Sequence, residues 1–180
     1  MSAAERRQRQ TIYSGKKVTL IVEEITTAHG KVLRETVQVP GAVVIVPVLA
    51  DGKVCLLRQH RPAVNKTLVE LPAGTLEPGE IPIVAAKREL AEETGYDAEH
   101  VYPVIEFYPS PGILTEKMYL FVAEGLRPGP RQLDADEEIE TWPIPFEQAL
   151  DLIRTGTIED GKTIVGLLLY AWQKGMISSA

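Results

Sequence analysis

Apolar and polar residues alternate in several short runs along this chain, and most runs end at a turn residue. Two strands with a turn at Gly30 are predicted for KKVTLIVEEIT and KVLRETVQV. A hairpin is predicted where β-branched residues flank Asp51 and Gly52, in AVVIVPVLA and KVCLLRQHR. Further strands are expected in TLVELPAG, VYPVIEFYP, KMYLFVAEGL and EEIETWPI. The first two strands precede the main pattern, so we expect them to form a small sheet of their own.

Helical spacing follows in three segments. Pro82 suits the first position of a helix and Gly95 the residue just past its end, so a helix is expected over residues 82–94. Two later helices are predicted for PFEQALDLIRTG and DGKTIVGLLLYAWQKG. Because helices and strands mix without regular alternation, we expect an α/β fold with a mixed sheet. Residues 1–40 are assigned to an N-terminal β extension and residues 41–180 to the main domain.

The composition is that of a globular protein. The chain has 180 residues, of which 44% are hydrophobic, which is enough for one domain with a full core. No run approaches the roughly 18 apolar residues that span a bilayer, and the start MSAAERRQRQ lacks the apolar segment of a signal peptide. We therefore expect a soluble cytoplasmic protein with no membrane partner.

Charge and cysteine content narrow the function classes. A net charge of -6 argues against a sequence-independent nucleic-acid binder, because phosphates are neutralised by a basic surface. An acidic enzyme can still bind a polyanion through metal ions. The single Cys55 lies in an apolar strand pattern and is interpreted as a buried residue; a catalytic thiol would need a polar, partly exposed setting. The three histidines share no metal-ligand spacing.

An acidic cluster lies within one turn of the first predicted helix. At 100° per residue, Glu89, Glu92 and Glu93 share an arc of about 100°. Like charges at this spacing repel one another, and a solvated acidic face is their usual explanation. Carboxylates are also the ligands that Mg²⁺ takes, and a bound ion would offset the repulsion.

The sequence around this cluster resembles the signature of the Nudix hydrolases. The matching positions are Gly74, five residues, Glu80, seven residues, then Arg88, Glu89, Leu90, any residue, Glu92, Glu93, any residue and Gly95. The resemblance implies a Nudix α/β/α sandwich with a mixed sheet, plus the small N-terminal antiparallel sheet. It also implies metal-dependent hydrolysis of a diphosphate linked to another group.

The resemblance implies roles for the residues of this signature, or Nudix box. Glu89, Glu93 and the backbone carbonyl of Ala73 are expected to bind the metal. Glu92, counted with the catalytic residues, is a ligand or a partner of the ligands. Arg88 is expected to pair with glutamates of the box, although alone it would be interpreted as a surface ion pair. Three further positions are expected to support the box, namely Gly74, Glu80 and Gly95. The expected cofactor is Mg²⁺, with Mn²⁺ as a possible substitute, which polarises phosphorus and lowers the pKa of a bound water.

The segment RQHRPAVNKTLVELPAG, upstream of the box, resembles the ADP-ribose pyrophosphatases within this family. There, the residue that matches Arg61 touches the phosphates or the terminal ribose, and those that match Gln59 and Glu70 lie near the ligand. Without the resemblance, Arg61 would be an ordinary charge at the end of a strand.

Downstream, FYPSPGILTEKMYLFVA carries a second resemblance to that group. Pro111, followed by Gly112, matches a proline that marks the ADP-ribose group, and Glu116 matches an acidic residue of many members. The residues alone would indicate a Pro-Gly loop between two strands. Together the two segments favour hydrolysis of ADP-ribose to AMP and ribose 5-phosphate. Another nucleoside diphosphate sugar such as GDP-mannose is the alternative, and a non-catalytic nucleotide-sugar-binding module is the contrasting hypothesis.

The general base is expected outside the box, in DADEEIETW. The family uses a glutamate of an acidic loop before a late strand, which points to Glu137 and, second, to Glu138. From the residues alone this loop would be solvated surface.

Residues 17–39 resemble the N-terminal extension of the ADP-ribose pyrophosphatases, which helps to form a homodimer and a shared adenine pocket. Tyr13 is interpreted either as a platform for a base or as an interface aromatic. Trp142 and Trp172 lie in strand and helix patterns and are expected in the core.

Overall fold

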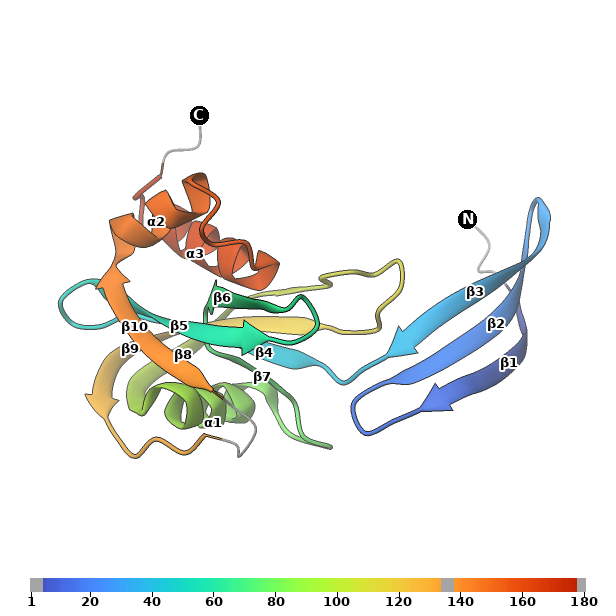
Figure 1. Ribbon diagram of the computed structural model, residues 1–180, viewed down its shortest axis with the longest axis horizontal. Coiled ribbons are helices and arrows are strands. Elements are labelled where there is room, and N and C mark those ends of the chain that lie inside the picture. The colour runs from blue at the N-terminus through green and yellow to red at the C-terminus, as the bar shows by residue number, and fades with distance from the viewer. Residues whose placement is uncertain (1–4, 134–137, 178–180) are drawn as a thin grey trace. The chain divides into compact units, whose positions relative to one another are not determined.

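The computed structural model describes residues 5–133 and 138–177 (Figure 1). The chain divides into two compact units, Met1–Gly41 with Phe107–Lys117, and Ala42–Glu106 with Met118–Ala180. The first unit differs from the predicted N-terminal extension because the segment 107–117 joins it.

The first unit is built on an antiparallel sheet of order β1-β2-β3. Its strands are β1 (Glu5–Ser14), β2 (Thr19–Thr27) and β3 (Gly30–Gln38). β2 and β3 confirm the two predicted strands. The segment 107–117 attaches through β3, where the Val37 N–H donates to the Ile113 carbonyl at 2.8 Å and the Thr115 N–H donates to the Val37 carbonyl at 3.1 Å.

The second unit contains two sheets between helices. One sheet has the order β7-β4-β9-β8, and β4 is antiparallel to β7 but parallel to β9, which confirms the predicted mixed sheet. The other has the antiparallel order β10-β5-β6. The strands are β4 (Ala42–Pro47), β5 (Lys53–Arg61), β6 (Lys66–Glu70), β7 (Ala73–Thr75), β8 (Tyr96–Phe107), β9 (Met118–Pro128) and β10 (Ile139–Pro145).

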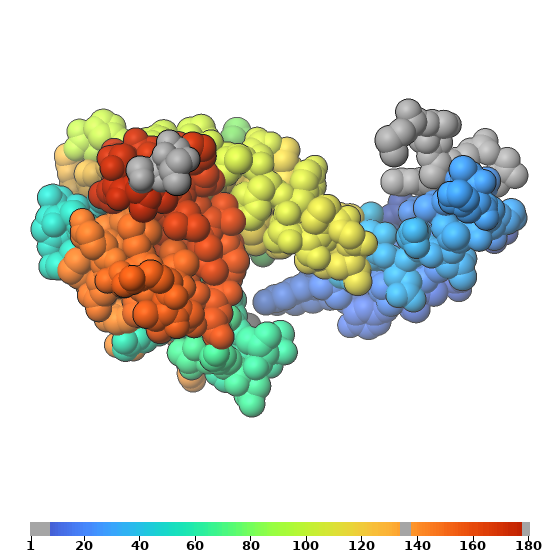
Figure 2. Space-filling view, turned by 90° about the horizontal axis from the view of Figure 1, so that it is seen from above, coloured from blue at the N-terminus to red at the C-terminus, as the bar shows by residue number. Residues whose placement is uncertain are grey.

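The helices of this unit lie on both sides of the sheets. They are α1 (Pro82–Thr94), α2 (Phe146–Arg154) and α3 (Gly161–Gln173). Figure 1 shows α1 on one side and α2 with α3 on the other, which is the predicted α/β/α arrangement. In the space-filling view, α2 and α3 (orange and red) form one face of this unit (Figure 2).

The acidic helix α1 has the predicted boundaries. Ile81 precedes it without a side-chain cap, and Gly95 ends it with a left-handed φ of 73°, a conformation that glycine adopts readily. Its apolar side packs on the sheet, where Leu90 lies in one core cluster with Val43 and Phe121. The helix is therefore fixed along its buried side, which also includes Glu89 and Glu93.

The expectations for three side chains have different outcomes. Cys55 is 0% exposed, and burial raises the pKa of its thiol to about 11, so it is a buried packing residue as expected. The expectation for Trp172 was wrong, because its side chain lies near the end of α3 and is 60% exposed. Trp142 is half-buried, and the guanidinium of Arg58 lies 4.0 Å from its ring centre.

None of the helices in the described part of the chain has the length and apolar character that crossing a membrane requires.

Candidate active site

Arg88 is the centre of the acidic cluster on α1. Its Nε and Nη2 donate to the two oxygens of Glu80 at 3.0 and 2.9 Å. Its Nη1 donates to Glu89 Oε1 at 2.8 Å and to Glu92 Oε2 at 2.9 Å. The hydrogen bond from Arg88 lowers the pKa of Glu80, because it stabilises the carboxylate form. One guanidinium thus provides the counter-charge for three carboxylates of the box.

Gly74 makes room for one of these carboxylates. Glu89 is 9% exposed, and its side chain lies against the backbone of β7. A Cβ added at Gly74 would come within 1.8 Å of Glu89 Cδ, which no packing adjustment of a few tenths of an ångström relieves. The glycine of the box is therefore required by the position of the Glu89 carboxylate.

Glu93 joins the helix to the same strand. Its side chain is buried, and Oε2 accepts a hydrogen bond from the Ala73 backbone N–H at 2.9 Å. The structure therefore brings Ala73, Gly74, Glu89 and Glu93 together where β7 meets α1.

The donor set at this junction fits a hard divalent cation. Carboxylate oxygens and a backbone carbonyl are ligands that Mg²⁺ and Mn²⁺ accept. Glu89 and Glu92 also converge, since one oxygen of each accepts from the same nitrogen of Arg88. Among the described residues, no three Asp, Glu, His or Cys side chains are already gathered as a metal site. Two of the carboxylates that would hold the ion, Glu89 and Glu92, are instead arranged around Arg88, and the third, Glu93, accepts from the Ala73 N–H.

A second charged group lies on the β5-β6 sheet. Glu70 Oε1 and Oε2 accept from Arg61 Nε and Nη2, both at 2.7 Å, and the Glu70 side chain is 2% exposed. Cross-strand pairing of Leu57 with Glu70 and of Gln59 with Leu68 places Gln59, Arg61 and Glu70 on one face. The structure thus brings together these three predicted substrate-binding residues.

Lys162 contacts the same carboxylate and was missed by the sequence analysis. Its Nζ donates to Glu70 Oε2 and, at 2.9 Å, to Asp160 Oδ1. Burial alone would raise the pKa of Glu70, but the hydrogen bonds from Arg61 and the charge of Lys162 lower it. In the sequence, Lys162 lies directly after the predicted helix start in DGKT. The helical spacing does not indicate a contact between this lysine and Glu70, which lies 92 residues earlier in a strand.

The start of α3 also holds the segment that leads into the box. Asp160 caps the helix by accepting from the Thr163 N–H at 3.0 Å. Thr163 Oγ1 accepts from the Leu71 N–H at 2.7 Å. Leu71 is followed closely by Ala73, so α3 helps to fix the strand against which Glu89 and Glu93 lie.

The remaining predicted site residues are Pro111, Gly112, Glu116, Glu137 and Glu138. Pro111, Gly112 and Glu116 belong to the first unit, whereas the box and Arg61 belong to the second. Glu138 is exposed and directly precedes β10. Glu137 lies outside the described residues.

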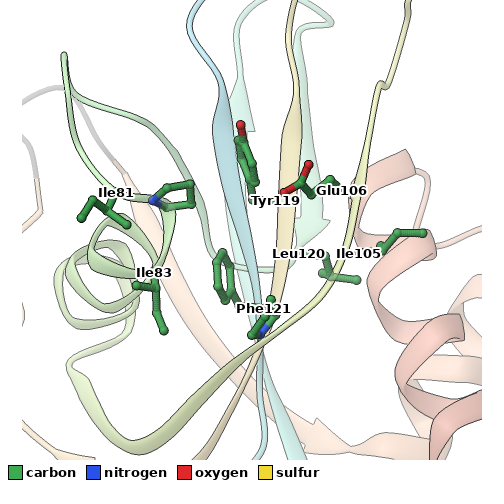
Figure 3. A pocket seen from close by; sticks show the side chains of 9 residues that line it. Ile81, Ile83, Ile105, Glu106, Tyr119, Leu120 and Phe121 are labelled. Atoms are coloured by element: carbon green, nitrogen blue, oxygen red, sulfur yellow. The ribbon is translucent and has the colours of Figure 1, made fainter.

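An apolar hollow of about 300 Å³ opens near the first turn of α1 (Figure 3). Ile83 from the helix, Ile105 from β8 and Phe121 from β9 line it. Its polar lining residues include Glu106 and Tyr119, and no glutamate of the box lines it. The hollow is therefore separate from the acidic cluster.

Comparisons with known proteins identify relatives over most of the chain. A model of the NUDIX domain matches residues 39–165. An ADP-ribose pyrophosphatase of Bacillus subtilis (strain 168) is 41% identical over 158 residues, 86% of this chain and 85% of that protein. A methanol dehydrogenase activator of Bacillus methanolicus is 36% identical over 170 residues, 93% and 92% of the two chains. A GDP-mannose pyrophosphatase of Enterobacter sp. (strain 638) is 35% identical over 171 residues, 88% of each.

A solved structure shares the fold. The crystal structure of an ADP compounds hydrolase superposes with a TM-score of 0.87 and 24% identity, covering 98% of this chain and 97% of that one. The fold class predicted from the sequence is confirmed by this likeness.

Proposed function

This chain belongs to the NUDIX domain family, and on that premise we propose that it hydrolyses ADP-ribose to AMP and ribose 5-phosphate. The observation that carries the proposal is the complete box, in which Glu89 and Glu93 meet β7 at Gly74 and Ala73. The similarity to an ADP-ribose pyrophosphatase supports the choice of substrate.

We assign the metal ligands to Glu89, Glu93 and the Ala73 carbonyl, with Glu92 as a fourth ligand or a partner of the others. Nudix hydrolases generally need a divalent metal, and we propose Mg²⁺, with Mn²⁺ as a substitute. When bound, such an ion neutralises the diphosphate and lowers the pKa of a coordinated water. Arg88 holds the carboxylates of Glu89 and Glu92 close together before binding.

Arg61 is the proposed contact for the substrate phosphates. Its two hydrogen bonds to Glu70 fix the plane of the Arg61 guanidinium, while the Arg61 side chain remains 37% exposed. A fixed and accessible guanidinium suits bidentate binding of a phosphate. Gln59, on the same face, is proposed to lie beside the ligand.

The remaining assignments rest on the resemblance of the sequence. Pro111, Gly112 and Glu116 are proposed to contribute to substrate binding. Glu137 or Glu138 is the proposed general base. We keep the cytoplasm as the proposed compartment, on the sequence argument alone.

We propose a homodimer formed through the N-terminal strands, with residues 1–40 as the extension and 41–180 as the hydrolase domain. The first unit supports this, because its sheet exposes large apolar side chains, Ile12 at 51% and Leu33 at 67%. A three-stranded sheet gains stability when such a face is covered.

Two other functions are favoured by specific relatives. The GDP-mannose pyrophosphatase supports a different nucleoside diphosphate sugar as substrate. The methanol dehydrogenase activator supports a role in regulating another protein, with or without catalysis.

A substrate panel distinguishes these functions. ADP-ribose, GDP-mannose, NADH, FAD and diadenosine polyphosphates would be compared by kcat/KM with Mg²⁺ and with Mn²⁺. The proposal predicts the highest kcat/KM for ADP-ribose, with AMP as product. A higher kcat/KM for GDP-mannose than for ADP-ribose would make GDP-mannose the proposed substrate. Binding of these compounds without hydrolysis would favour the non-catalytic nucleotide-sugar-binding module.

A further inference from the structure

Arg131 joins the acidic helix to the start of β10. Its Nε donates to the backbone carbonyl of Glu93, and its Nη2 donates to that of Ile139, both at 2.7 Å. A single guanidinium thus spans two carbonyls from two different elements. Because the guanidinium is planar and rigid, these two bonds also fix the distance between the carbonyls.

The end of α1 is well suited to receive this cation. The last carbonyls of a helix lack partners within the helix and carry partial negative charge. The last turn of α1 contains no basic residue of its own. Arg131, 38 residues after Glu93, supplies the missing positive group from another part of the chain.

The segment around Arg131 follows the end of this helix through further bonds. The Gly129 N–H donates to the Gly95 carbonyl at 2.7 Å, and the Gln132 N–H donates to the Glu92 carbonyl at 3.3 Å. The contact of Arg131 is therefore one of several that hold the segment against α1, and it alone among these three extends to β10.

Of the two residues whose carbonyls bind Arg131, one is a proposed metal ligand and the other adjoins a candidate general base. Glu93 provides its backbone carbonyl to Arg131, while its carboxylate is a proposed metal ligand. Ile139 is 7% exposed, pairs with Gln59 and directly follows Glu138, the described one of the two candidate bases. Arg131 thus ties the strand that begins beside the base to the helix that carries the ligands.

We propose that Arg131 is a positioning residue for hydrolysis, which holds the start of β10, and with it Glu138, in place relative to the glutamates of α1. The inference rests on the proposed function and on Glu138 as its general base. Arg131 acts through backbone carbonyls and touches neither substrate nor metal in this account. A displacement of about 1 Å in a reacting group can reduce a rate by about 100-fold, so loss of the link should act on kcat.

The test compares three variants in the full-length protein, with ADP-ribose and saturating Mg²⁺. Arg131→Ala removes both bonds, and Arg131→Lys keeps the charge but cannot span both carbonyls as a planar fork. Arg127→Ala is the matched control, since Arg127 is an exposed arginine of β9 that pairs with the exposed Glu99. We expect Arg131→Ala to lower kcat by about 10- to 100-fold with KM within about twofold, and Arg131→Lys to fall between.

Chemical rescue separates positioning from general stability. Added methylguanidinium should restore part of the kcat of Arg131→Ala, without changing the wild-type or Arg127→Ala kcat. If wild type hydrolyses ADP-ribose but Arg131→Ala keeps kcat within about twofold, the positioning role is wrong. A kcat loss that methylguanidinium does not restore and that accompanies a lower Tm also overturns it. If Arg131→Ala does not fold, Arg131→Lys decides by the same kcat and KM criteria. Absence of hydrolysis in wild type would instead refute the proposed function.

Discussion

The α-carbon of Gly74 lies so close to the Glu89 carboxylate that a methyl group on it would come within 1.8 Å of Glu89 Cδ. Gly74→Ala is therefore expected to displace Glu89 and to lower kcat by at least about 100-fold. Metal affinity, measured by calorimetric Mg²⁺ titration, should fall as well. Gly161→Ala is the control, because a Cβ there meets nothing within 4 Å. Equal kcat values for the two variants would show that the position of Glu89 does not depend on Gly74.

Arg88 is expected to stabilise the metal-free protein. Arg88→Gln removes the counter-charge of Glu80, Glu89 and Glu92, and should lower the free energy of unfolding by about 1–3 kcal/mol. Saturating Mg²⁺ should recover more stability in the variant than in wild type, since the ion relieves repulsion that Arg88 no longer offsets. Urea denaturation with and without Mg²⁺ measures both effects. An equal gain from Mg²⁺ in the two proteins would contradict this role.

Glu70 should contribute a pH-dependent stability. Its pKa in the folded state is lowered from an ordinary value of 4.5, so folding favours the ionised form. This contribution is present above about pH 4.5 and is lost as the pH falls through the lower folded pKa. Glu70→Gln should therefore be less stable than wild type at pH 7, with a smaller difference near pH 3. Tm measured from pH 7 to pH 3 tests this, and a difference that does not narrow on acidification would exclude it.

The sequence predicts much of this site because the box is local. Glu89, Glu92 and Glu93 lie on one helical turn, so their convergence follows from helix geometry alone. Arg61 and Glu70 required the resemblance to a family, because only strand pairing brings them together.

Contacts over long sequence distances were not predictable in this way. Lys162 reaches Glu70 across 92 residues, and Arg131 reaches Glu93 across 38 residues. Neither residue stands out in the local pattern, since lysine and arginine at helix starts and in loops are usually solvated. β1 was missed for a related reason: ERRQRQTIYS is mostly polar and lacks the alternation that identifies a half-buried strand. Trp172 shows the opposite error, where an apolar helical pattern continues onto an exposed surface.

The general base should be identified by single replacements in the acidic segment. Glu137→Gln and Glu138→Gln remove one proton acceptor each, and the true base should lose kcat by about 100- to 10,000-fold with little change in KM. In the variant that lacks the true base, the plot of kcat against pH should also lose its acidic limb, because that limb reports the ionisation of the base. Small and equal effects of both replacements would remove this segment from the mechanism.

The most direct test of the central claim is the turnover of Glu93→Gln with ADP-ribose at saturating Mg²⁺. The glutamine oxygen can still accept the hydrogen bond from the Ala73 N–H, so the fold around β7 should persist and Tm should change little. Loss of the carboxylate charge removes a proposed metal ligand, and we predict that kcat falls by about 1,000-fold or more. Turnover close to that of wild type would contradict the assignment of this acidic helix as the metal site.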